Sequence, residues 1–301
     1  MKVLLAGVNS YIGKRMIGFL AEKGHHVVCL VRDKQLFCKQ NELSRNVTVI
    51  SGDLLRMQTV ESFPQDIDAA YYLINTLTQT SEFAGLEALS ARHFIDRINS
   101  TACRQIITLT GIQHHSSPNI LSRQHVEDIL GSGRAALTVF RTTMIIGDGS
   151  IATELLKTVT GKTPVIVAQS WTKARVQPIW VNDVLSYLEA CLLNEKTYNR
   201  KFDIGGPEVL SFKQMLLYYI AVNIKQKPGI IAVPMLTSKM SSYLLNILTP
   251  VSYTMAKGII ETLQEDNICR DNSIAAILPR EGTNFKRSLR LLHDGPAPIF
   301  N

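Results

Sequence analysis

The sequence has few cysteines and no long apolar run, and each absence argues against a class of protein. Its five cysteines are odd in number and lack Cys-x-x-Cys spacing, which argues against a disulfide framework or a zinc site. The apolar segment at 235–248 is interrupted by Lys239 and Asn246 and is too short to span a bilayer. We therefore expect a cytoplasmic protein with no membrane span and no bound metal.

Basic residues are in excess, but they are not gathered in one place. The 301 residues include 32 Lys and Arg against 25 Asp and Glu, a formal charge of +7, and no run of five basic residues occurs. A nucleic-acid interface needs basic residues clustered on one face, so we expect no nucleic-acid partner. The apolar fraction of 46% allows a sizeable core in one large domain or two closely joined ones, which excludes intrinsic disorder.

Strand-like and helix-like segments alternate along the first half of the chain. Short apolar runs occur at 3–6, 27–31, 47–51, 69–74, 105–109 and 137–140, and helical periodicity occurs at 12–21, 85–98 and 122–130. This alternation predicts an α/β fold in which helices cover both faces of a doubly wound parallel sheet.

The pattern changes near residue 145. Strand-like runs become sparse, at 164–167, 176–179 and 202–204, and helical runs dominate, at 184–193, 212–222, 238–248 and 253–263. We therefore divide the chain into a core at 1–145 and a mixed region at 146–301. The second region is expected to complete the sheet and to form a smaller, mainly helical lobe, where a substrate would sit.

The first predicted strand leads into a tight turn and then a helix. In the segment Gly7-Val8-Asn9-Ser10-Tyr11-Ile12-Gly13, Ser10 stands where a Gly-x-x-Gly-x-x-Gly pattern has its middle glycine. Glycine allows the sharp turn, a small residue lets backbone N–H groups approach a pyrophosphate, and the positive end of the helix dipole faces the anion. The turn therefore predicts dinucleotide binding.

The end of the second predicted strand indicates which dinucleotide is bound. NAD-specific folds place an acidic residue there, but this chain has the apolar Val31 followed by Arg32. Arg32, helped by Lys34, suits a 2′-phosphate and predicts NADP, whereas Asp33 keeps NAD possible.

The segment Leu5–Gly13 resembles the T-G-A-S-G-Y-I-G of atypical short-chain dehydrogenase/reductases, close to the NmrA-like and extended-type branches. Later segments resemble further motifs of that family in the same order, at 52–54, 140–147, 178–184 and 205–211. Residues 225–301 resemble an uncharacterised bacterial subgroup. The resemblance implies that residues 1–145 form a Rossmann core that binds a dinucleotide.

The resemblance also implies, position by position, which residues hold the cofactor. The turn would line the pyrophosphate, Arg32 would meet the adenosine ribose, residues 53 and 54 would flank adenine, and the end of the fourth strand would lie near the nicotinamide ribose. The implied cofactor residues are Gly7, Asn9, Ser10, Tyr11, Ile12, Gly13, Arg32, Asp53, Leu54, Leu73, Ile74 and Asn75.

The catalytic pair of the family is missing. Family members that reduce carbonyls carry Ser or Thr after the fifth strand and Tyr-x-x-x-Lys on the next helix, where the tyrosine protonates a developing alkoxide. Thr110 can take the serine role, but Asn119 stands at the tyrosine position and Arg123 at the lysine position. Arg123 stays charged and can hold a ribose hydroxyl. His115, in the loop after the strand, is the candidate proton donor.

Two functions remain open at this point. The first is an NADPH-dependent oxidoreductase acting on a small quinone-like or enone-like molecule, with Thr110, His115 and Arg123 as catalytic residues. The second is a non-catalytic dinucleotide sensor or assembly protein of the NmrA-like type, whose protein partner would dock at 235–248. The missing Tyr-x-x-x-Lys pair supports the second, and both need the cofactor turn, in which Ser10 replaces the middle glycine. The first is our leading expectation.

Overall fold

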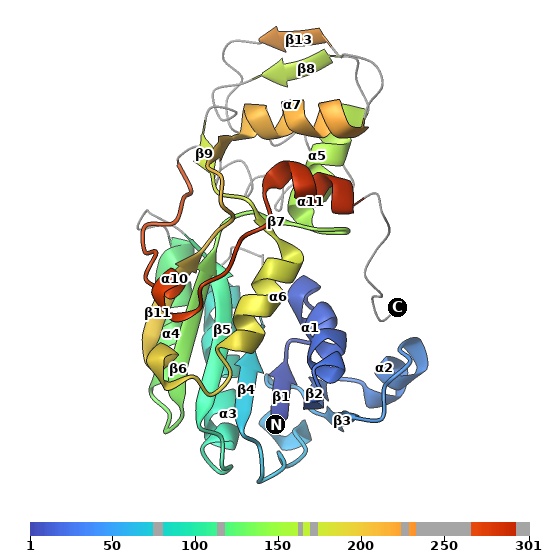
Figure 1. Ribbon diagram of the computed structural model, residues 1–301. Coiled ribbons are helices and arrows are strands. Elements are labelled where there is room, and N and C mark those ends of the chain that lie inside the picture. The colour runs from blue at the N-terminus through green and yellow to red at the C-terminus, as the bar shows by residue number, and fades with distance from the viewer. Residues whose placement is uncertain are drawn as a thin grey trace.

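The computed structural model describes residues 1–74, 81–112, 118–161, 165–168, 174–223, 229–232 and 266–292. Within these ranges a parallel sheet of seven strands forms the centre of the molecule (Figure 1). Its strands are β1 (Lys2–Ala6), β2 (His26–Val31), β3 (Val47–Ser51), β4 (Ala69–Tyr72), β5 (Gln105–Gly111), β6 (Ala136–Thr142) and β11 (Arg200–Ile204). These strands are rich in Val, Ile and Leu because both faces of the sheet are buried.

The strand order is β3-β2-β1-β4-β5-β6-β11, and every neighbouring pair is parallel. The chain winds outward from β1 in one direction through β2 and β3, and then in the other direction from β4 onward. Parallel sheets of this kind bind ligands beyond the carboxyl ends of the strands, where the winding direction reverses. That point lies between β1 and β4. The predicted doubly wound α/β fold is confirmed.

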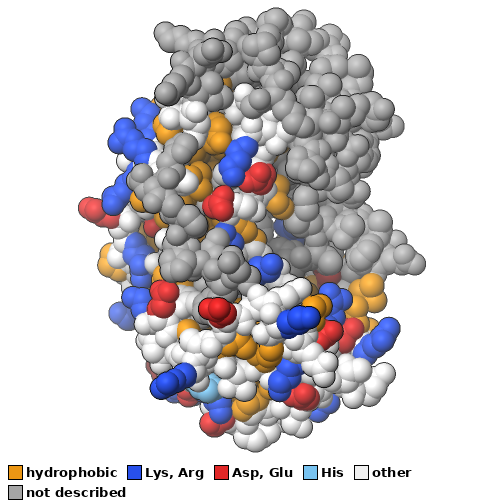
Figure 2. Space-filling model, turned by 90° about the vertical axis from the view of Figure 1, so that its right-hand side faces the viewer, with side chains coloured by type: hydrophobic (Ala, Val, Ile, Leu, Met, Phe, Trp, Pro, Cys, Tyr) orange, Lys and Arg blue, Asp and Glu red, His pale blue; other side chains and the backbone are white. Residues whose placement is uncertain are grey.

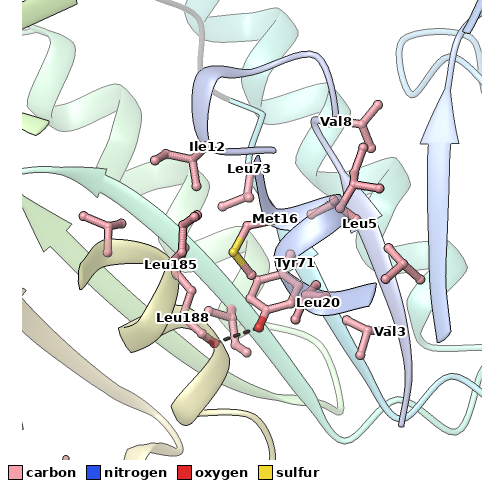
Figure 3. Close-up of a cluster of buried hydrophobic side chains, with 14 of the residues drawn as sticks. Val3, Leu5, Val8, Ile12, Met16, Leu20, Tyr71, Leu73, Leu185 and Leu188 are labelled. Atoms are coloured by element: carbon pink, nitrogen blue, oxygen red, sulfur yellow. Dashed lines mark hydrogen bonds between the residues drawn. The ribbon is translucent and has the colours of Figure 1, made fainter. Parts of the chain in front are cut away.

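Helices cover the two faces of the sheet. One face carries α1 (Tyr11–Glu22) and α6 (Val181–Ala190), and the other carries α3 (Ser81–Ile98) and α4 (Pro118–Gly131). Figure 3 shows the core on the α1 side, where the buried Tyr71 directs its hydroxyl to the carbonyl oxygen of Leu188 at 2.7 Å. This hydrogen bond satisfies the one polar atom of the side chain and ties α6 to β4.

A third cluster of buried side chains lies beyond the carboxyl ends of the strands (Figure 1). It is built from α5 (Ile151–Gly161), α7 (Phe212–Asn223) and α11 (Phe285–Leu291). Short strand pairs accompany it: β7 (Ile145–Ile146) with β10 (Ile179–Trp180), β9 (Arg175–Val176) with β12 (Leu210–Ser211), and β8 (Val165–Ala168) with β13 (Gly229–Ala232). The remaining elements are α2 (Lys34–Gln40), α10 (Ile274–Ile277) and the 3₁₀ turns Met57–Thr59 and Glu195–Thr197.

The second half of the chain required corrections to the predicted elements. Residues 176–179 are not one strand, because β9 pairs with β12 and β10 pairs with β7, on either side of Gln177 and Pro178. The helix predicted at 184–193 begins earlier, at Val181, and ends at Ala190. The helices predicted at 238–248 and 253–263 lie outside the described residues. The domain boundary at residue 145 stays a prediction.

Figure 2 shows Lys and Arg side chains interspersed with Asp and Glu on one face of the molecule. None of the helices in the described ranges combines the length and apolar character that crossing a bilayer requires.

Candidate functional site

The turn after β1 is shaped by two glycines. Gly7 has φ +91°, and a Cβ at this position would stand 2.5 Å from the backbone carbonyl of Leu73 at the end of β4. A Cβ at Gly13 would collide with the carbonyl oxygen of Gly7. Both positions therefore exclude a side chain, and the turn packs directly against the neighbouring strand end.

Ser10 caps the helix that follows the turn. Its backbone N–H donates to the carbonyl of Gly7 at 3.0 Å, and its Oγ accepts from the N–H of Gly13 at 3.0 Å. The backbone N–H groups of Tyr11 and Ile12 have no acceptor among the described residues. The positive end of α1 therefore offers two free donors and the helix dipole to an anion.

The Tyr11 side chain supports this turn and does not act as a base. Burial raises the pKa of Tyr11 to about 12, although the Arg15 guanidinium, 3.9 Å from the centre of the ring, acts in the opposite direction. The phenol oxygen fills the space that a Cβ at Gly147 would need. Tyr11 is therefore a neutral packing residue at physiological pH.

The predicted adenosine end lies at the carboxyl ends of β2 and β3. Arg32 is exposed directly after β2, whereas the Asp33 carboxylate accepts the N–H of Leu36 at 2.9 Å and caps α2. Asp53 shapes its own turn, because its carboxylate accepts the N–H of Leu55 at 3.0 Å. The Leu54 side chain is 5% exposed and belongs to the core on the α3 side. Among these residues Arg32 has the side chain most available to a ligand.

The turn opens into an apolar cavity of about 360 Å³. Ser10, Tyr11 and Ile12 line it from the turn, and Leu73 lines it from the end of β4. Thr110 and Arg123 line it from β5 and α4, and the loop after β6 together with α5 closes the other side. The cavity therefore brings four of the predicted cofactor residues and two of the three predicted catalytic residues to one place.

Arg123 has an unusual environment for a guanidinium. Burial lowers the pKa of Arg123, while the carboxylates of Glu87 and Glu127 raise it. No side chain or carbonyl in the described part of the chain accepts a hydrogen bond from it. The group stays protonated in any protein environment of this kind, so it presents unsatisfied donors to the cavity.

The structure adds two polar residues that the sequence analysis missed. Thr142 and Asn267 line the same cavity, and their side-chain oxygens, Oγ1 and Oδ1, are buried without a hydrogen-bond partner among the described residues. Thr142 carried a signal, because it replaces the proline of the family motif at 140–147. Asn267 carried none, because a backbone hydrogen bond to Arg175, 92 residues away in the sequence, brings it to the site.

Some predicted site residues cannot be placed. Asn75 and His115 lie outside the described residues, and so does the side chain of Asn119. Asn9 is exposed in the turn. The described residues contain no group of three or more His, Cys, Asp or Glu positioned to hold a metal ion.

Comparisons with known proteins agree with this geometry. A family model described as NAD(P)H-binding matches residues 7–170, more than half of the chain. No curated protein matches the chain.

Solved structures match almost the whole chain at low sequence identity. A nucleoside-diphosphate-sugar epimerase from Staphylococcus aureus has a TM-score of 0.72 at 13% identity, over 96% of this chain and 100% of that one. UDP-glucose 4-epimerase from Thermotoga maritima has a TM-score of 0.69 at 12% identity, over 98% of each chain. A short-chain dehydrogenase/reductase superfamily protein from Agrobacterium tumefaciens with bound NAD has a TM-score of 0.67 at 11% identity, over 98% of this chain and 96% of that one. At these identities the likeness shows the fold alone.

Proposed function

Because this chain belongs to the NAD(P)H-binding family and has the fold of the short-chain dehydrogenase/reductases, we propose that it is an oxidoreductase that uses NADPH. The resemblance drawn from its motifs is confirmed for family and fold. The reaction itself, a reduction that uses NADPH, is our proposal. The observation that carries it is the cavity shared by the turn after β1, Thr110 and Arg123.

The residues present fit a dinucleotide. Side chains are excluded at Gly7 and Gly13, which leaves the backbone of the turn open to a pyrophosphate. The free N–H groups of Tyr11 and Ile12 would donate to that pyrophosphate. The apolar cavity beyond them, with Leu73 at its wall, would hold the nicotinamide end.

The second strand supports NADP over NAD. A ribose 2′-hydroxyl needs an acceptor, and Asp33 already uses its carboxylate to cap α2. Arg32 is exposed beside it and would pair with a 2′-phosphate. We therefore propose NADPH as the preferred cofactor.

The reacting group would lie near Thr110 and Arg123. Bound NADPH would supply a hydride, and reduction of a quinone or enone needs one proton in addition. Thr110 would donate a hydrogen bond to the acceptor oxygen, and Arg123 would hold the ribose and stabilise negative charge that develops on that oxygen. His115 or water would supply the proton. A conjugated acceptor suits this site, because its negative charge is delocalised and it depends less on a tyrosine acid.

A non-catalytic dinucleotide sensor is the second candidate. It is favoured by Asn119 at the tyrosine position, because an amide cannot donate the proton as a phenol does. Tyr11, the tyrosine among the described lining residues, packs from the turn after β1 against Gly147, and its hydroxyl has no hydrogen-bond partner among the described residues. This candidate predicts dinucleotide binding without turnover.

Calorimetric titration of the purified protein with NADPH and NADH tests the proposal. NADPH is expected to bind at least tenfold more tightly than NADH, and Arg32→Ala is expected to remove that preference while leaving NADH binding unchanged. Arg92→Ala, at an exposed arginine on α3, is the matched control. A panel of quinones and enones is then screened for oxidation of NADPH. Failure of both dinucleotides to bind would overturn both candidates, and binding without turnover would favour the sensor.

A further inference from the structure

A second cavity of about 410 Å³ adjoins the apolar one. The two cavities share the end of β5, at Thr110–Ile112, and they share Arg123. The second cavity lies between α4 and the edge of the sheet formed by β6 and β11, which are neighbours in Figure 1. Its size is typical of small-molecule sites.

The register of the sheet places charged groups in this cavity. Thr110 pairs with Arg141, and Arg141 pairs with Asp203, so the three residues form one row across β5, β6 and β11. Paired residues in neighbouring strands point to the same face. Helix α4 lies over this face and adds Arg123 and Glu127 to the cavity wall.

The carboxylates of the cavity already have partners within the protein. Glu127 is only 3% exposed, and its Oε2 lies 2.7 Å from Nη2 of Arg141 and 2.7 Å from Nζ of Lys201. Asp203 accepts the backbone N–H groups of Arg270 and Asp271, at 2.9 and 3.2 Å.

The third carboxylate, Asp271, accepts the backbone N–H and the hydroxyl of Ser273, at 2.8 and 3.0 Å. Each of the three acids thus uses two of its roughly four acceptor sites on groups of the protein itself.

The cationic side chains of the cavity, in contrast, keep hydrogen-bond donors that no described group accepts. Arg123, Arg141, Lys201 and Arg270 outnumber the three carboxylates by one among the described lining residues. Arg123 donates no hydrogen bond within the described part of the chain, and the side chain of Arg270 donates none there either. Arg141 uses one terminal nitrogen on Glu127 and keeps its other donors. The groups of the cavity wall that remain free to bind a ligand are therefore mainly the N–H donors of arginine side chains.

We propose that this polar cavity binds the anionic group, a carboxylate or a phosphate, of the molecule that is reduced in the apolar cavity. Only the claim that the molecule is reduced in the apolar cavity rests on the proposed function. The claim that the polar cavity binds an anionic group does not depend on it. Arg123 stands at the junction of the two cavities, and its five N–H donors let it reach the acid group as well as the ribose and the acceptor oxygen. Arg270 closes the far side. The substrate is thus an acid that carries its reducible group within a few bonds of the acid group.

The experiment follows backbone amide resonances of the ¹⁵N-labelled protein, without dinucleotide, at constant ionic strength. The probes are malonate, inorganic phosphate and the neutral malonamide. Saturable shifts at Gly111, Arg270 and Asp271 are expected with malonate or phosphate and not with malonamide. The anion that binds more tightly identifies a carboxylate or a phosphate as the preferred group.

Variants locate the anion. Arg123→Gln and Arg270→Gln are each expected to weaken binding at least fivefold, and Arg92→Gln, at an exposed helix position, is expected to change nothing. Because Arg270 is exposed, its substitution leaves the fold intact and keeps the test valid if Arg123→Gln fails to fold.

Three results would overturn the anion site: no saturable shift with either anion, shifts confined to the amides of residues 11–13, or an equal loss in Arg92→Gln. Dinucleotide binding is measured separately, so the two proposals can fail independently. Anion binding in a protein that binds no NADPH would leave the anion site standing and remove the proposed reaction.

Discussion

The Oγ of Ser10 accepts a hydrogen bond from the backbone N–H of Gly13 at 3.0 Å, so the residue that replaces the middle glycine of the turn caps helix α1 itself. The serine thereby occupies a donor that a bound pyrophosphate would otherwise approach. The helix is stabilised, and the anion is left with the N–H groups of Tyr11 and Ile12.

Ser10→Gly is therefore expected to tighten NADPH binding about fivefold, equal to about 1 kcal/mol, the order of one hydrogen bond. Loss of the cap to glycine costs a few tenths of a kcal/mol in stability. Calorimetry gives the affinity and thermal unfolding gives the stability. Ser10→Ala frees the same N–H but keeps a Cβ, so it separates the two effects. Weaker binding in both variants would show that the hydroxyl contacts the cofactor.

Gly7→Ala is expected to destabilise the protein by about 2 to 5 kcal/mol, because a left-handed backbone and a steric collision add together. The collision is with the carbonyl of Leu73. Gly24 is the matched control, since it has φ +81° but no atom within 4 Å of its Cβ position. Gly24→Ala should lower the free energy of unfolding by only about 1 kcal/mol. Urea unfolding measures both, and equal losses would contradict the close approach at Leu73.

Glu127→Gln is expected to lower the free energy of unfolding by about 2 kcal/mol, because two hydrogen bonds to a charged group are weakened. Arg141 and Lys201 both lose their carboxylate partner. The same change removes a negative charge from the polar cavity, so malonate or phosphate should bind more tightly. Urea unfolding and the amide titration measure the two effects. Glu22→Gln, at the exposed end of α1, should alter neither.

Gln105→Leu is expected to destabilise the protein by about 3 kcal/mol, because it leaves buried polar groups without partners. Gln105 is fully buried, and its amide donates to Thr138 at 2.8 Å and to the carbonyl of Cys191 at 3.0 Å. It also accepts the N–H of Leu193. Urea unfolding of a double-mutant cycle with Thr138→Val measures the shared energy. Strict additivity of the two changes would contradict the network.

The ion pair between Asp266 and Arg175 predicts a pH dependence at the edge of the site. Hydrogen bonds from the Arg175 side chain and backbone hold the pKa of Asp266 below its usual range. A carboxylate whose folded-state pKa is lowered stabilises the fold above its unfolded pKa, about 3.9, and loses this contribution as the pH falls through the lowered value. NMR titration of the Asp266 carboxyl should show the low pKa. Arg175→Gln should raise it part of the way toward the usual range, because the backbone N–H of residue 175 still donates to the carboxylate, whereas Arg92→Gln should not move it.

Local chemistry explains why so much of the first half was predictable. The short apolar runs that become β1 to β6 and the turn at 7–13 are each encoded within a few consecutive residues. The prediction of a phosphate-binding turn used the spacing of Gly7, Ser10 and Gly13 at the first strand–helix junction, together with Gly24 at the end of the helix. The strand at 176–179 was predicted wrongly, because which partner each half would pair with cannot be read from so short a segment.

The sequence by itself determined the alternating α/β pattern, the glycine turn at 7–13 and the absence of a tyrosine at position 119, because each depends on residues close together in the chain. Only the tertiary structure decided that Asp33 is used as a helix cap and that Asn267 reaches the cavity. It also decided that Glu127 pairs with both Arg141 and Lys201 and not with Arg123. These relationships depend on strand register and on hydrogen bonds between distant segments, and the pattern of neighbouring residues does not encode them.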